Sequence, residues 1–413
     1  MTRFERDTEH FFRQESGRLV AALTRSLGPA HLDLAEQAVQ DAFLQALRAW
    51  PMHGKPSDPA AWLYRTARNA ALDALRRHSR FEDRVDQIAE TIRPPVSEEE
   101  AHFSGEIVDD QLRMMFLCCH PALSRASRVA LTLKIAGGLS AAEIARSFRT
   151  SESTIQQRLV RAKSKLQELD APFDLPPESE APARLEAVLD ALFLVFNEGY
   201  SPGDGPDGLR RELMQEAIRL CQLVSMHPAG REPHVYALLA LMYFQSSRTD
   251  ARFDETGALL PLEEQDRSRW SSAAIRAGFA ALESAGRGVR LTEYHLLAGI
   301  AAVHAAAERE EDTNWERIVA LYDELLSRSN SDALRLNRAV AVVRAAGAEA
   351  GLRVVEELRE AMADHYLWSA ARADALGKLG RAADAADAWR GAAERARTDA
   401  ERRYFLRRAG ETG

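Results

Sequence analysis

The chain has 413 residues, of which 28% are charged, and a formal net charge of −8. That length allows two to four domains with buried cores. No apolar stretch approaches the roughly 20 residues that span a bilayer, and the charged N-terminus lacks the apolar segment of a signal peptide. We therefore expect a cytoplasmic protein with no membrane partner. Abundant Ala, Leu, Arg and Glu, with few β-branched runs, predict an all-α fold.

The net negative charge comes entirely from the C-terminal part of the chain. Residues 176–413 hold 30 basic and 38 acidic residues, which accounts for the whole −8. Basic residues outnumber acidic ones by five to one in residues 60–80 and by ten to four in residues 111–170. Between these blocks, residues 81–110 carry ten acids and two arginines. Two basic blocks joined by an acidic linker indicate two DNA-facing modules, despite the overall charge.

Residues 32–48 form the first predicted amphipathic helix. Its apolar residues, which we expect to pack inward, are Leu34, Ala38, Phe43, Leu44 and Leu47. Its acidic and amide-rich face consists of Asp33, Glu36, Gln37, Gln40 and Asp41. These residues alone are compatible with a solvated surface and with a docking surface for a protein partner.

A predicted loop follows, because Pro51, Gly54, Pro56 and Pro59 interrupt regular structure. A second helix then begins near Trp62, with Leu63, Ala67, Ala70, Ala74 and Leu75 as its apolar residues. Its other side carries, at spacings of three or four residues, Trp62, Arg65, Asn69, Asp73 and Arg76. Aromatic rings stack on unpaired bases, amides bond base edges and Arg holds phosphates, so this face suits single-stranded DNA.

Cys118, Cys119 and His120 are residue types that bind metals, but no second ligand pair stands at a usable spacing. We expect them to end a buried helix before Pro121. The sequence contains no nucleophile-base-orienter set and no phosphate-cradling Gly loop. We therefore expect no metal, no cofactor and no enzymatic activity.

Residues 139–169 predict two short helices around a tight turn. Ser140 and Glu143 fit a capping box worth about 1 kcal/mol, and Ser151 fits the N-cap of the second helix. The inward residues of that second helix are Ile155, Leu159, Ala162 and Leu166, and the outward ones are Ser153, Gln156, Gln157, Val160, Arg161, Lys163 and Lys165. Gln can bond an adenine edge, Val can contact a thymine methyl group, and Arg and Lys can neutralise phosphates. This pattern favours a DNA-reading helix over the alternative, a surface helix with solvated charges.

The C-terminal part shows a repeat after a break marked by Pro172, Pro176, Pro177 and Pro182. Equivalent positions recur every 33 or 34 residues in three sets: Ile318, Gly351 and Ala385; Tyr322, Val355 and Trp389; Leu325, Leu358 and Ala392. This period is typical of tetratricopeptide-like helix pairs, whose stacked surface suits a protein or peptide partner. A plain helical scaffold is the alternative.

Three motifs in order, DLAEQAVQDAFLQAL, WLYRTARNAALDALRR and LSAAEIARSFRTSESTIQQRLVRAKSKL, resemble bacterial sigma factors of the extracytoplasmic-function (ECF) group. The tail motifs LFLVFNEGYSP, EQDRSRW and LNRAVAVVRAAG resemble the subgroup with a large C-terminal extension of tetratricopeptide repeats, often called the ECF42 type. The implied organisation is a sigma region 2 helical bundle (1–80), an acidic linker (81–108), a helix-turn-helix sigma region 4 (109–171), a Pro-rich linker (172–182), a helical extension (183–290) and an α-solenoid of repeats (291–413). One departure is Ser153-Thr154-Ile155, where the group usually has Gly-Thr-Val.

The resemblance also implies partners and residue roles. Core RNA polymerase would be bound through its β′ clamp and its β flap, and promoter DNA through both regions. The implied polymerase-binding residues are Asp33, Glu36, Gln37, Gln40, Asp41 and Phe43. Beside the loop of residues 50–58, the implied −10 element contacts are Trp62, Arg65, Asn69, Arg76 and Arg77. The implied −35 element contacts are Ser153, Thr154, Gln156, Gln157, Arg158, Val160, Arg161 and Lys163.

We therefore predict a sigma factor that directs promoter recognition and transcription initiation, with a C-terminal regulatory or interaction extension. The main alternative is a helix-turn-helix transcriptional regulator with a repeat-based sensor tail that works without polymerase. A further alternative is an enzyme or scaffold whose tail carries the main activity.

Overall fold

The computed structural model describes residues 3–78, 103–148, 150–200 and 209–412. Over these residues the regular structure is helical, and the one β-type pairing is an isolated bridge between Phe253 and Leu259. The predicted all-α fold is confirmed. Most of the predicted acidic linker, 81–108, lies outside the described residues. Its last residues, 103–108, belong to the helix α5 (Phe103–Cys118).

The chain divides into two compact units. Unit 1 contains residues 1–195 and 219–230, and unit 2 contains residues 196–218 and 231–413. Helices α9 (Ala181–Tyr200) and α10 (Arg211–Met226) contribute residues to both units. Each unit has its own set of buried apolar side chains, so each is described separately below.

The first three helices of unit 1 are α1 (Arg3–Leu27), α2 (Leu32–His53) and α3 (Pro59–His78), with a short helix η1 (Pro29–His31) before α2. Helix α2 packs against both α1 and α3. Its buried face consists of Leu32, Ala35, Ala38, Val39, Ala42, Ala46 and Trp50. Leu44 and Leu47, which we expected to pack inward, are instead 51% and 50% exposed. Leu44 comes two residues after the buried Ala42, which is about 200° around the helix. Its side chain therefore points away from the buried alanine face.

The loop predicted from Pro51 onward is shorter than expected. Helix α2 continues through Pro51 to His53, although Pro51 has no N–H to donate to the Leu47 carbonyl. Gly54 ends the helix at φ 83°, a left-handed conformation that favours glycine, and its N–H donates to the Trp50 carbonyl at 2.9 Å. The Asp58 carboxylate then accepts the Ala61 N–H at 2.9 Å at the start of α3.

The remaining helices of unit 1 include α5 (Phe103–Cys118), α6 (Arg125–Leu131), the π-helical turn η3 (Thr132–Ala136), α7 (Ala141–Ser147) and α8 (Glu152–Glu168). Helix α1 packs against both α5 and η3. The contact with η3 is close, because a Cβ atom on Gly17 would lie 2.4 Å from the Ala136 carbonyl oxygen. Glycine is therefore required there for packing.

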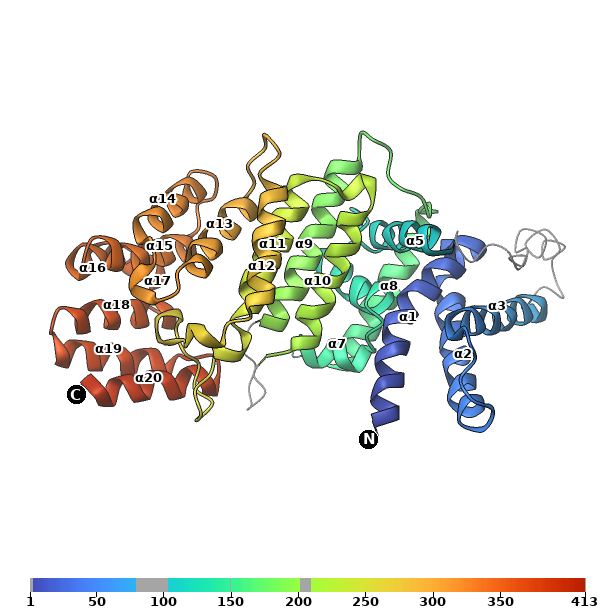
Figure 1. The fold of residues 1–413 in the computed structure, drawn as a ribbon, viewed down its shortest axis with the longest axis horizontal. Helices are drawn as coiled ribbons and strands as arrows, with labels where there is room; N and C mark the ends of the chain where they lie inside the picture. Colours follow the sequence, from blue (N-terminus) through green and yellow to red (C-terminus); the bar gives the residue numbers. More distant parts are fainter. Residues whose placement is uncertain (1–2, 79–102, 149, 201–208, 413) are drawn as a thin grey trace. The chain divides into compact units, whose positions relative to one another are not determined.

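Unit 2 is a succession of helices: α11 (Pro233–Ser247), α12 (Ser272–Ala285), α13 (Glu293–Ala306), α14 (Trp315–Leu326), α15 (Asp332–Ala345), α16 (Ala348–Glu357), α17 (Arg359–Met362), α18 (Tyr366–Lys378), α19 (Ala382–Glu394) and α20 (Asp399–Thr412). Single-turn helices are η4 (Pro228–Gly230, in unit 1), η5 (Thr249–Ala251), η6 (Leu262–Glu264), η7 (Arg267–Arg269) and η8 (Glu310–Asp312). From α14 onward, the helices pack mainly on their neighbours in the chain, as the orange to red part of Figure 1 shows.

Three apolar clusters hold these C-terminal helices together. One joins α13, α14 and α15 around Ile318, the next joins α15, α16 and α18 around Val355, and the last joins α18, α19 and α20 around Trp389. Such local clusters distribute stability along the chain, in the manner of stacked helical units. Among the described residues, no helix has both the length and the apolar character needed to cross a membrane.

Candidate nucleic-acid interface

Two capped helices form the predicted helix-turn-helix. The Ser140 hydroxyl accepts the backbone N–H of Glu143 at 3.2 Å, and the Glu143 carboxylate accepts the backbone N–H of Ser140 at 2.7 Å. The Ser151 hydroxyl accepts the backbone N–H of Thr154 at 3.1 Å, which begins α8. The predicted capping box and second N-cap are both confirmed. They satisfy N–H groups that have no partner within their own helix.

The outer face of α8 is open to solvent. The predicted inward residues Ile155, Leu159, Ala162 and Leu166 are all buried. The exposed candidates for DNA contact are Ser153, Thr154, Gln156, Gln157, Val160 and Arg161, whereas Arg158 is half-buried. Val160 is 63% exposed, so its methyl groups are available to a thymine methyl group. The Gln156 amide donates to the Glu152 carboxylate at 3.0 Å, and this bond stays on the outer face.

Lys163 does not share this exposed face. Its ammonium group donates to the Asp33 carboxylate at 2.5 Å and also to the Glu36 carboxylate, and its side chain is 13% exposed. Burial alone would lower the pKa of Lys163, but the carboxylates of Glu36 and Asp33 outweigh it and raise that pKa. The expectation that Lys163 looks outward is therefore wrong for this arrangement, because α2 supplies two carboxylates beside it.

The candidate polymerase-binding residues on α2 are only partly accessible. Gln37, Gln40 and Asp41 are exposed, and the side chain of Asp33 is 70% exposed. The side chain of Glu36 is 11% exposed, because Lys163 and Lys134 cover it. Phe43 is half-buried and stacks on Phe12, with ring centroids 4.4 Å apart. The acidic and amide face thus exists as predicted, with Glu36 withdrawn from it.

On α3, the predicted single-strand face is largely solvent-facing. Arg65 and Asn69 are exposed, and Arg76, 61% exposed, pairs with Asp73 at 3.6 Å. Trp62 is half-buried, and its ring meets Trp50 edge-on at 5.7 Å. The indole therefore packs within region 2 as well as reaching the surface. The side chain of Arg77 lies outside the described residues.

The Cys-Cys-His motif ends α5, as the sequence predicted. Cys118 and Cys119 are buried, and the Cys119 thiol lies 3.4 Å from the Thr132 hydroxyl. Burial raises the pKa of Cys119 to about 11, which keeps it a thiol, whereas metals bind thiolates. Within the described part of the chain, no group of three His, Cys, Asp or Glu side chains is placed to hold a metal ion.

Comparison with known families agrees with this geometry. Sigma-70 region 2 matches residues 11–81, and Sigma-70 region 4 matches residues 113–166. Residues 184–286 match a family of unknown function, DUF6596. The chain is also 41% identical to an uncharacterized protein of Rhizobium meliloti (strain 1021) over 389 residues, covering 90% of this chain and 89% of that protein. The chain therefore contains a sigma-70 region 2 and a sigma-70 region 4, and these two domains support a sigma factor role.

Helices α2 and α3 lie in region 2, and α6, η3, α7 and all but the last two residues of α8 lie in region 4. The two regions therefore support a role in promoter recognition and transcription initiation. The sequence analysis missed two region 4 residues, Lys134 and Gln167, that contact region 2. Lys134 pairs with Glu36 at 3.6 Å, and the Gln167 amide donates to the Ala30 carbonyl at 2.7 Å. No sequence signal marks them, because Glu36 lies 98 residues from Lys134 and Ala30 lies 137 residues from Gln167 in the chain.

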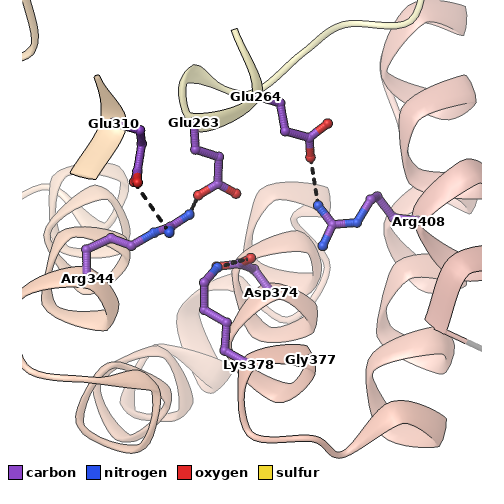
Figure 2. A pocket seen from close by; sticks show the side chains of 8 residues that line it. All are labelled: Glu263, Glu264, Glu310, Arg344, Asp374, Gly377, Lys378 and Arg408. Atoms are coloured by element: carbon purple, nitrogen blue, oxygen red, sulfur yellow. Dashed lines mark hydrogen bonds and ion pairs between the residues drawn. The ribbon is translucent and has the colours of Figure 1, made fainter. Parts of the chain in front are cut away.

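Unit 2 contains a charged cavity of about 470 Å³ (Figure 2). Arg344 pairs with Glu263 and, at 3.4 Å, with Glu310. Lys378 pairs with Asp374, and Arg408 pairs with Glu264 at 2.8 Å. Each cation of the cavity wall thus has a carboxylate partner. The pairs of Arg344 and Arg408 link α15 to η6 and η8 and link α20 to η6, whereas the Lys378 pair lies within α18.

Proposed function

We propose that this protein is a sigma factor of the ECF group and belongs to its ECF42 subgroup. In this proposal it binds the β′ clamp of core RNA polymerase through α2 and also contacts the β flap of the polymerase. It reads the −35 element with α8 and captures an unpaired base of the −10 element beside α3. Because bacterial transcription takes place in the cytoplasm, the protein would work there.

One observation carries this proposal: two separate exposed faces combine amides with guanidinium groups in one chain. On α8, Gln156, Gln157 and Arg161 are exposed, and on α3, Arg65 and Asn69 are exposed. Amides discriminate base edges and guanidinium groups hold phosphates, in duplex and in single-stranded DNA alike. A regulator that binds duplex DNA alone has no use for the second face.

We further propose that the C-terminal helices are tetratricopeptide-like repeats that bind a protein or peptide partner and regulate initiation. Three observations support this. The residues of the 34-residue period fall on α14, on or just after α16, and on α19. Eight of these nine residues are buried, and Tyr322 is half-buried. A Cβ atom on Gly351 would lie 2.1 Å from the Val343 Cγ2 atom, so a small residue lets the paired helices approach.

The test is transcription with purified components. Transcript starts mapped after overexpression identify a promoter, and that promoter is then combined with core polymerase and the purified protein. We expect a specific start that depends on both. Asn69→Ala should reduce opening of the −10 element, with duplex binding at −35 unchanged.

The rival function gives a different outcome. A polymerase-independent regulator would bind the same promoter as a free protein and would yield no new transcript start with core polymerase alone. Asn337→Ala, which removes an exposed amide from α15 in unit 2, is the matched control for Asn69→Ala.

A further inference from the structure

Four contacts join helix α2 of region 2, and the short helix η1 before it, to region 4. Lys163 bonds Asp33 at 2.5 Å and Glu36, Lys134 pairs with Glu36 at 3.6 Å, and Gln167 donates to the Ala30 carbonyl at 2.7 Å. We call these six residues the clasp. It brings two ammonium groups from region 4 against two carboxylates from region 2.

The clasp is largely withdrawn from water. The side chains of Glu36, Lys163 and Lys134 are 11%, 13% and 19% exposed. Salt screens such partly buried pairs much less than it screens exposed ones. The raised pKa of Lys163 agrees with a pair that favours its charged form. Asp33, in contrast, is 70% exposed and lies at the edge of the clasp.

The packing around the clasp combines close contact with open space. Gly17 of α1 lies against η3 so closely that no Cβ atom would fit. Beside Glu36, however, a cavity of about 230 Å³ separates Gln40 and Phe43 of α2 from Ser140 and Glu143 of region 4. The two sides are thus not packed continuously along α2, and the clasp contributes bonds that the surrounding apolar contacts do not replace.

We propose that the clasp is an autoinhibitory contact, in which region 4 covers the acidic part of the polymerase-binding helix until polymerase displaces it. The inference rests on the proposed function, because it takes α2 as the polymerase-binding helix and Lys163 as a phosphate contact. Lys163 and Lys134 lie against the α2 carboxylates, where basic groups of polymerase would bind in the proposed complex. Asp33 and Glu36 lie against Lys163, where a DNA phosphate would bind in the proposed complex. The most buried members, Glu36 and Lys163, cannot serve an external partner while the clasp is formed.

Opening and polymerase binding are therefore linked. If only the open form binds, the apparent dissociation constant equals the intrinsic one divided by the fraction of open molecules. A substitution that weakens the clasp, without touching the proposed binding residues, must tighten polymerase binding. Lys134 and Gln167 allow this test, because neither is among the candidate polymerase or DNA contacts.

The first measurement is an intramolecular distance in the free full-length protein. Spin labels are attached at Arg48→Cys on α2 and Ser164→Cys on α8, both exposed positions outside the clasp. The native cysteines Cys118, Cys119 and Cys221 are buried, so the labels go to the new sites. We expect one narrow distance distribution, which broadens toward longer distances in the Lys134→Ala/Gln167→Ala double variant. Adding core polymerase to the unsubstituted labelled chain should produce the longer distances as well.

The second measurement is the affinity for core polymerase. Lys134→Ala/Gln167→Ala should bind roughly five-fold more tightly than the unsubstituted chain, equivalent to about 1 kcal/mol. Lys165→Ala is the matched control, because Lys165 pairs within α8 with Glu168 at 3.1 Å and not with α2. It removes one positive charge from region 4 and should leave both the distance and the affinity unchanged.

The outcomes separate this inference from the proposed function. If the chain directs specific transcription but the double variant changes neither the distance nor the affinity, the clasp does not restrain the protein and the inference is wrong. If the distance responds as expected but no variant binds core polymerase, the contact stands and the proposed function is wrong.

Discussion

At the scale of single residues, the chemistry of α8 separates two kinds of DNA contact. Gln156 presents an amide that can bond a base edge, whereas Arg161 presents a charge that can neutralise a phosphate. Lys163 has the same residue type as a phosphate contact but pairs with Asp33 and Glu36. Residue type and helical spacing alone could not distinguish Lys163 from Arg161.

Gln156→Ala should cost about 1–3 kcal/mol at one position of the −35 element, because a base-edge bond carries sequence discrimination. The measurement is binding to a set of duplexes, each altered at one base pair. The variant should become indifferent to one position and keep its preferences at the others. Unchanged preference at every position would remove Gln156 from the proposed contacts.

Arg161→Ala should instead weaken binding to all sequences alike and reduce the salt dependence of the binding constant by about one phosphate contact. Titrations at several salt concentrations measure that slope. Arg161→Lys keeps the charge and is the control, so its slope should match the unsubstituted chain. A loss confined to one base pair would contradict the phosphate role.

His304 in unit 2 should make stability depend on pH. Burial, aided by the charges of Arg248 and Arg267, lowers the pKa of His304 to about 3, from 6.5. Between these values only the unfolded chain binds the proton, so stability falls as pH drops below 6.5. From pH 7 to pH 5 the contribution lost is about 2 kcal/mol. Urea unfolding at both pH values should show a smaller loss in His304→Leu, and equal losses would refute this assignment.

At the scale of elements, local sequence signals fix the helix ends of the DNA reader. Ser140, Glu143 and Ser151 cap α7 and α8 as the sequence predicts, because an N-cap bond spans only three residues. The signals for α2 were less decisive. Pro51 suggested a loop, yet it lies inside the last turn, and Gly54 ends the helix. Its buried face is made by alanines rather than by Leu44 and Leu47, since the approach of α1 and α3 decides which side is covered.

Ser140→Ala should destabilise the helix-turn-helix by about 1 kcal/mol, because the Glu143 backbone N–H loses its acceptor at 3.2 Å. Faster hydrogen exchange at the first amides of α7, together with a lower free energy of unfolding, would report this. Ser164→Ala, on the exposed side of α8, is the control and should change neither quantity.

At the scale of the whole molecule, the fold separates into two units with their own cores. Regions 2 and 4 belong to the same unit, and the C-terminal helices are held by three local clusters. A change in the last cluster should therefore stay within unit 2.

Trp389→Ala tests this separation. Trp389 is 3% exposed and packs on Tyr404 and Phe405 with centroid distances of 5.9 and 5.8 Å. Its removal should cost about 3–5 kcal/mol in unit 2. Hydrogen exchange should become faster in α18, α19 and α20 and stay unchanged in α7 and α8. Faster exchange throughout unit 1 would mean that the two units unfold together.

The sequence by itself determined the helical class, the capped helix-turn-helix, the buried end of α5 and the two faces rich in amides and arginines. These features depend on residues three to seven positions apart, whose spacing is set by helix geometry. The tertiary structure alone decided that Lys163 and Lys134 meet α2 and that Gln167 meets η1. It also decided that Arg344, Lys378 and Arg408 line one cavity with their carboxylates. Such contacts join distant segments, and their partners are selected by how helices pack rather than by any local pattern.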